Sequence, residues 1–168
     1  MAGLKSNEVH LEPYDAAWPE IFSREASALR AALGPLAMKV EHIGSTAVAG
    51  MIAKPIIDIA IKTESFNVLP QIIEAMRSAG YESKGEFGLP GRQFFTKGDP
   101  TFFHVHVVER QSGHWPRWIS FRDALRANGL LRAEYEKMKR DLAAKFENDR
   151  PSYTAAKTNF IEEALSNR

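Results

Sequence analysis

The chain has 168 residues, of which 22 are basic and 21 acidic, so its formal net charge is +1, and it contains no cysteine. Its content of 44% hydrophobic and 26% charged residues is typical of a folded globular protein. The near-zero charge argues against nucleic acid or an anionic membrane surface as a partner. The lack of cysteine excludes a disulfide framework, a thiolate zinc site and a cysteine nucleophile. Because the sequence also shows no signal-peptide core and no run of about 18 apolar residues, we expect a soluble cytoplasmic protein.

The first two thirds of the chain alternate between helical and strand-like patterns. Apolar residues recur at helical spacing over 19–33 and stop at Gly34 and Pro35. The run PIIDIAIK (55–62) is apolar almost throughout, which is typical of a strand covered on both faces. In chain order the patterns predict a short strand or extended entry at 8–14, a helix at 19–33, strands at 38–43 and 55–62, a helix at 65–79 that starts afresh at Pro70, short strands at 81–87 and 91–98, and a strand at 101–109.

Three helical patterns follow residue 113, separated at Gly129 and Pro151. Proline suits the first turn of the last helix, with Asp149 as a possible N-cap. The break near Gly113 is too short for a free linker. We expect a single domain over 1–168, with an α/β half at 1–112 and a helical half at 113–168 packed on it.

The stretch EHIGSTAVAGMIAKPIIDIAIK (41–62) contains the first candidate binding residues. Gly44 would let the backbone approach a phosphate, and Ser45 and Thr46 could donate hydrogen bonds to it; an ordinary turn is the alternative. Lys54 either neutralises phosphate charge at the entry of the next strand or is simply exposed. Asp58 inside that strand would be costly to bury without a partner, so it either caps a neighbour at a sheet end or binds a cation.

The strand at 101–109 carries His104 and His106, which are separated by Val105. Residues two apart on a strand face the same side, so both imidazoles can point at one site. Together with one acid they could form a three-ligand metal site. Two surface histidines on a solvated sheet face are the alternative.

Pairs of long polar side chains recur four residues apart in the helical half: Arg122 with Arg126, Tyr135 with Lys139, and Tyr153 with Lys157. This spacing places both members of a pair on one helix face. The pairs could form a wall that faces phosphate. They could equally form solvent-facing rows, with the tyrosines packed between helices.

Five segments in this order resemble the GrpB family: VEHIGSTAVAGMIAKPIIDI, FHVHVVE, FRDALR, EYEKMKRDLA and YTAAKTNFIEEAL. The resemblance runs from residue 14 to the C-terminus. It implies an α+β fold of the nucleotidyltransferase-like superfamily, with a mixed β-sheet flanked by helices and followed by a C-terminal helical segment. Gly44 and Ser45 then correspond to the Gly-Ser motif of that superfamily. A related module is fused after dephospho-CoA kinase in some proteins.

The chain departs from the acidic pattern that the resemblance implies. Active members of the superfamily carry two acids on the strand after Gly-Ser and a third on a later strand, and these hold two metal ions. Here Asp58 matches the first acid, Ala60 occupies the second position, and the later strand offers His104 and His106. We therefore expect one divalent metal ion, and histidine ligands favour a transition metal over magnesium.

The leading hypothesis is a nucleotidyltransferase-like protein that binds a nucleotide or phosphorylated small molecule, with metal-dependent nucleotidyl transfer as its activity. The assigned residues are Gly44, Ser45 and Thr46 for phosphate, Lys54, Arg122 and Arg126 for charge balance, Asp58, His104 and His106 for Mn²⁺, Zn²⁺ or Mg²⁺, and Asp58 with His104 for catalysis.

Two other functions stay open at this point. A non-catalytic ligand-binding or regulatory module is favoured by Ala60 and opposed by the histidine pair. A hydrolase with a histidine-held metal and an activated water would need no acceptor.

Overall fold

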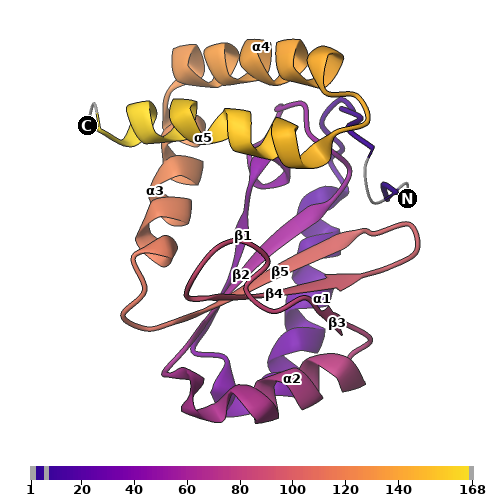
Figure 1. Cartoon of the computed structure of the whole chain (residues 1–168), viewed down its shortest axis with the longest axis vertical. Helices are drawn as coiled ribbons and strands as arrows, with labels where there is room; N and C mark the ends of the chain where they lie inside the picture. Colours follow the sequence, from indigo (N-terminus) through magenta and orange to yellow (C-terminus); the bar gives the residue numbers. More distant parts are fainter. Residues whose placement is uncertain (1–2, 6–7, 167–168) are drawn as a thin grey trace.

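Within residues 3–5 and 8–166, which the computed structural model describes, five strands form one mixed sheet in the spatial order β1-β2-β5-β4-β3 (Figure 1). β2 pairs in parallel with β5, and the other neighbouring strands pair antiparallel. The strands are β1 (Lys39–Ile43), β2 (Ile57–Thr63), β3 (Glu82–Ser83), β4 (Arg92–Lys97) and β5 (Phe103–Glu109).

Helices flank this sheet on both faces. The α-helices are α1 (Trp18–Leu33), α2 (Leu69–Ser78), α3 (His114–Ala127), α4 (Gly129–Lys145) and α5 (Arg150–Ser166), and the short 3₁₀ helices are η1 (Gly34–Leu36), η2 (Ser45–Ala47) and η3 (Phe66–Val68). In Figure 1, α4 and α5 lie side by side at one end of the molecule, α3 leads up to them, and α2 lies at the opposite end. The predicted α+β fold, a mixed sheet flanked by helices, is confirmed.

The two faces of β2 have different partners. Ile57, Ile59 and Ile61 belong to the main apolar core with α1 and α2. The opposite face carries Asp58 and Ala60. Since successive side chains of a strand point to opposite faces, one strand supplies both the core and a polar position that the core does not cover.

Three local expectations can be compared directly with the described backbone. The segment 8–14 is an extended entry, not a strand, because its described pairing is an isolated bridge from Glu12 to Ala53. The helix predicted at 65–79 begins as η3 and continues as α2, with proline in its first turn, as expected. Asp149 is confirmed as a cap, because its Oδ1 accepts a hydrogen bond from the Ser152 backbone N–H at 3.1 Å.

The helical half of the chain is joined to β1 and to the segment that links β1 and β2. Arg122 of α3 donates to Glu41 Oε2 and to the His42 carbonyl, each at 2.9 Å. Glu136 of α4 accepts from the Ile52 backbone N–H at 2.8 Å. These bonds fix where α3 and α4 lie over the sheet. The grouping of both halves into one domain stays a prediction.

No helix in the described part of the chain combines the length and apolarity that a bilayer crossing requires. The cytoplasmic location stays a prediction.

Ala60 lies among apolar side chains on the face of the sheet that α3 covers. It is 0% exposed and packs in a cluster with Ile43, Val108 and Trp115. The position that would carry a second acid is therefore closed by apolar side chains.

We predict that Ala60→Asp lowers the free energy of unfolding by about 3 kcal/mol or more, because a carboxylate would be buried among apolar groups. Urea denaturation would measure the change. Ala133→Asp, at an exposed position of α4, is the matched control and should stay within about 0.5 kcal/mol of the wild type. A fully stable Ala60→Asp variant would show that this face has room for a second acid.

Candidate functional site

A cavity of about 1460 Å³ lies between the uncovered face of the sheet and the C-terminal helices. Residues of the turn after β1, of β2, β4 and β5, and of α3, α4 and α5 line it. We call it the central cavity. Of the predicted site residues, those that line it are Gly44, Ser45, Thr46, Lys54, Asp58, His104, His106 and Arg122.

A carboxylate between two imidazoles lies in the wall of the central cavity. Asp58 Oδ1 is 3.3 Å from His104 Nδ1 and 3.3 Å from His106 Nε2. The register explains this arrangement, because Asp58 is the direct parallel partner of His104 and the histidines are two residues apart on β5. The predicted convergence of one acid and two histidines on one point is therefore present.

The charge states of this group follow from its surroundings. Burial alone would raise the pKa of Asp58, but the contacts from His104 and His106 hold it well below its usual value. Burial lowers the pKa of His104 and outweighs the opposite effect of Asp58. Near neutral pH the group therefore combines an ionised carboxylate with a neutral His104 ring, which has a free nitrogen lone pair.

The turn after β1 brings the backbone against Asp58. Gly44 has a φ of +71°, and a Cβ placed there would lie 2.7 Å from Asp58 Oδ2, so only glycine fits. The next two hydroxyls already have protein partners. Ser45 Oγ accepts from Lys139 Nζ at 3.0 Å, and Thr46 Oγ1 lies 2.9 Å from His42 Nε2.

The basic residues that line the central cavity include Lys54, Arg150, Lys139 and Lys157. The Lys54 and Lys157 ammonium groups lie 5.5 and 4.6 Å from the centre of the same Tyr153 ring. Among the described residues, none of the four cations forms an ion pair within 4.0 Å. They form a positively charged group in which Asp58 is an acidic neighbour of Lys54, Lys157 and Arg150, whereas the acidic neighbour of Lys139 is Glu136.

Burial lowers the pKa of all three lysines. It brings Lys54 to about 7, helped by the neighbouring Lys157 and opposed by Asp58. It brings Lys139 to about 7, again with Lys157 contributing, and Lys157 itself to about 8. Near neutral pH the ammonium groups are thus close to losing their protons, and a bound anion would favour their charged form.

Two residues predicted to balance ligand charge, Arg122 and Arg126, already donate hydrogen bonds to other groups of the protein. Arg122 lines the cavity but donates to Glu41, to the His42 carbonyl and to Asp123. Arg126, which is not among the lining residues, donates to the Ala47 carbonyl at 2.7 Å. Their role toward a ligand stays a prediction.

The tyrosine–lysine pairs of the helical half are not solvent-facing rows. Tyr135 is 4%, Lys139 2% and Tyr153 1% exposed, and both pairs line the central cavity. The repeated spacing of four residues was the signal that could have assigned Lys139 and Lys157 to the site. Nothing comparable in the sequence marks Arg150.

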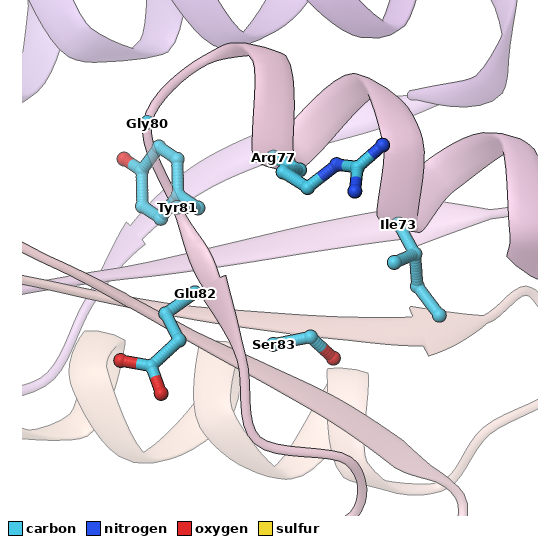
Figure 2. A pocket seen from close by; sticks show the side chains of 6 residues that line it. All are labelled: Ile73, Arg77, Gly80, Tyr81, Glu82 and Ser83. Carbon is cyan, nitrogen blue, oxygen red and sulfur yellow. The ribbon is translucent and has the colours of Figure 1, made fainter.

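A smaller hollow of about 310 Å³ lies between α2 and β3, lined by Ile73, Arg77, Gly80, Tyr81, Glu82 and Ser83 (Figure 2). Arg77 is paired with Glu74 at 2.5 Å. Because this hollow gathers no group of catalytic or metal-binding side chains, the central cavity is the candidate site.

The described residues contain no three His, Cys, Asp or Glu side chains arranged to hold a metal ion. Asp58, His104 and His106 supply suitable donor atoms, but their separations are those of contacts between the side chains themselves.

The family model for the GrpB protein matches residues 8–167. The chain belongs to the GrpB family. It is 38% identical over 172 residues to the glutamate-rich protein GrpB of Alkalihalophilus pseudofirmus, covering 99% of each chain. A crystal structure of GrpB from Enterococcus faecalis superposes with a TM-score of 0.84 at 34% identity, over 94% of this chain and 98% of that one.

Two more distant matches concern the wider relationships and the fold of the family. Dephospho-CoA kinase of Mycolicibacterium paratuberculosis is 29% identical over 93% of this chain, which spans only 45% of that protein; this agrees with the expected fusion. A structure of the Cid1 poly(U) polymerase with MgGTP bound matches with a TM-score of 0.55 at 14% identity, over 79% of this chain and 44% of that one. The fold is therefore nucleotidyltransferase-like.

We predict that the ligand-free protein becomes more stable as the pH rises from 7 to 9. A lysine with a pKa of about 7 when folded and 10.5 as the ordinary value binds more protons in the unfolded chain over this interval, so the free energy of unfolding increases with pH. The slope is at most about 1.4 kcal/mol per pH unit for each such lysine.

Urea denaturation at several pH values would measure this slope. Lys139→Met should flatten it, whereas Lys137→Met, at an exposed position of the same helix, should not. Equal slopes in both variants would mean that folding does not lower the pKa of Lys139.

Proposed function

We propose that this GrpB family member binds a nucleotide or another phosphorylated small molecule in the central cavity. The observation that carries the proposal is the group formed by Lys54, Lys139, Lys157 and Arg150, which has no acidic ion-pair partner within the described residues. The acidic neighbours of these four cations are Asp58, Glu136 and Glu8, and because none of them lies within ion-pair distance of a cation, an excess of positive charge is left. A multiply charged anion such as a di- or triphosphate would neutralise that excess.

The ligand's phosphates would lie between the lysines and the turn after β1. Ser45 Oγ accepts a hydrogen bond from Lys139 and also interacts with the Tyr135 hydroxyl, and its own hydroxyl hydrogen could turn to donate to a phosphate oxygen. Because Gly44 has no side chain, its backbone lies against the Asp58 carboxylate, so a phosphate bound at this turn would be close to Asp58. This arrangement would bring the anion next to the carboxylate–imidazole group.

We propose that Asp58 and His104 also hold a divalent metal ion when the ligand is bound. One carboxylate and one neutral imidazole suit Mn²⁺ or Zn²⁺ better than Mg²⁺, and phosphate oxygens would complete the ligand set. Such an ion would supply Lewis-acid charge at the phosphate.

Nucleotidyl transfer is the finer activity that we propose. The acceptor oxygen would form a bond to the α-phosphorus while the bond from that phosphorus to the pyrophosphate oxygen breaks. Asp58, ionised in the free protein, could accept the proton of the acceptor hydroxyl. Lys139 and Lys157 would stabilise the negative charge of the departing pyrophosphate.

A non-catalytic binding module is the second candidate function. Ala60 favours it, because the second acid position is filled by the packing of Trp115 against the sheet. Incubation with nucleoside triphosphates separates the candidates. Pyrophosphate release only with an acceptor indicates transfer, release without one indicates hydrolysis, and binding without turnover indicates a module.

We predict that pyrophosphate and nucleoside triphosphates bind the protein and that Lys139→Met weakens their binding at least about tenfold, since one charge-assisted contact is lost. Isothermal titration calorimetry at pH 7 would measure the affinities. Lys137→Met, on the same helix but exposed, should bind as the wild type does. Equal affinities in both variants would remove the lysine group from the site.

We predict that Asp58→Ala and His104→Ala each weaken Zn²⁺ and Mn²⁺ binding at least about tenfold without unfolding the protein, because each removes one of two protein ligands. Metal titration followed by circular dichroism would test both statements. If both variants bind metal as the wild type does, the proposed metal position is wrong.

A further inference from the structure

Arg92 makes an unusual set of contacts at the edge of the central cavity. Its guanidinium donates to the Glu86 carbonyl and to the Phe87 carbonyl, each at 2.9 Å. It also lies 3.2 Å from His106 Nδ1 and 4.7 Å from the centre of the Phe94 ring. Arg92 is only 9% exposed, so its guanidinium is held between the 86–87 backbone and His106.

This contact determines which ring nitrogen of His106 carries a proton. Arginine has only donors and stays charged in proteins, so His106 Nδ1 must accept. A neutral imidazole has one donor and one acceptor nitrogen, and the proton is therefore on Nε2. That nitrogen lies 3.3 Å from Asp58 Oδ1 and donates to it.

We infer that Arg92 is a positioning residue that fixes His106 as an Nε2–H donor to Asp58 and so keeps His106 from binding a metal ion. A nitrogen that carries a proton cannot coordinate a metal. For Nε2 to coordinate, the proton would have to move to Nδ1, where it would oppose the N–H groups of Arg92. In this arrangement the protein ligands are reduced to Asp58 and His104.

The His106 ring has little freedom to avoid this conflict. Its centre lies 5.1 Å from that of Phe94 and 5.3 Å from that of Trp118. Arg92 in turn is fixed by two carbonyls of the segment before β4. Phe87 in that segment has a left-handed φ of +46°, and the Arg92 bond to its carbonyl holds this conformation. The loop before β4 and the protonation of His106 are therefore linked through one guanidinium.

The role of His106 differs from that of His104, although both lie 3.3 Å from the same oxygen. Both rings interact with the Asp58 carboxylate, but among the described residues only His106 has a guanidinium on its other nitrogen. His106 is thus the hydrogen-bond donor that orients Asp58, and His104 is the histidine that is available to bind a metal ion.

The first test is long-range ¹H–¹⁵N correlation NMR of the imidazole nitrogens in the metal-free wild-type protein, with His106→Gln used to assign the signals. We expect the pattern of an Nε2–H tautomer for His106. An Nδ1–H tautomer would overturn the inference. This measurement needs no ligand, so it is independent of the proposed function. If the protein bound neither metal nor nucleotide, the proposed function would be wrong, but the tautomer of His106 could still be measured and would still test this inference.

The second test compares Arg92→Met with Arg110→Met, which removes an exposed arginine paired with Glu64 away from the cavity. In Arg92→Met, His106 should become a mixture of tautomers, and Zn²⁺ should bind about tenfold more tightly as His106 becomes a third ligand. Arg110→Met should keep the wild-type tautomer and affinity. In the wild type, Zn²⁺ should shift the nitrogen signals of His104 and leave Nε2 of His106 protonated. Loss of that proton on Zn²⁺ binding would overturn the inference, whether or not Arg92→Met folds.

Discussion

Asp58 is held ionised in the wall of a cavity because β2 and β5 run parallel and in register. The pairing places His104 directly opposite Asp58, and the period of two in β5 brings His106 to the same face. This negative charge favours the charged forms of the buried Lys54 and Lys157, because it opposes the lowering of their pKa values by burial. If the carboxylate were absent, burial of these groups would be more costly still.

Even with Asp58 present, the lysine group opposes folding. Lys139 is almost completely buried, and its pKa of about 7 means that part of its charge is lost rather than paired. Apolar side chains of similar size would fit between α4, α5 and the sheet at a lower free energy. Groups that reduce stability in this way are concentrated at binding sites, which favours a ligand over a structural explanation for Lys54, Lys139 and Lys157.

The sequence predicted what depends on local periodicity and missed what depends on packing. The strand period gave the shared face of His104 and His106, and proline at position 70 gave the restart of α2. The adjacency of β2 and β5 depends on a pairing between segments more than 40 residues apart, which no local pattern contains. Arg122 and Lys139 looked alike in sequence, as cations on helices. Both line the cavity, and only the packing of α3 and α4 pairs Arg122 with Glu41 and places Lys139 against Ser45 instead.

The helical half explains how a site that lacks the second acid of the superfamily pattern could still neutralise the negative charge of a phosphate. In the pattern that the superfamily resemblance implies, several carboxylates recruit metal ions, and the ions neutralise phosphate. Here α3 closes the second acid position by packing Trp115 over Ala60, while α4 and α5 bring lysines to the same cavity. On the proposed function, fixed ammonium groups supply positive charge that a second metal ion would otherwise provide. Because a bound anion favours the charged form of a lysine whose pKa is near 7, such a site would take up protons as it fills.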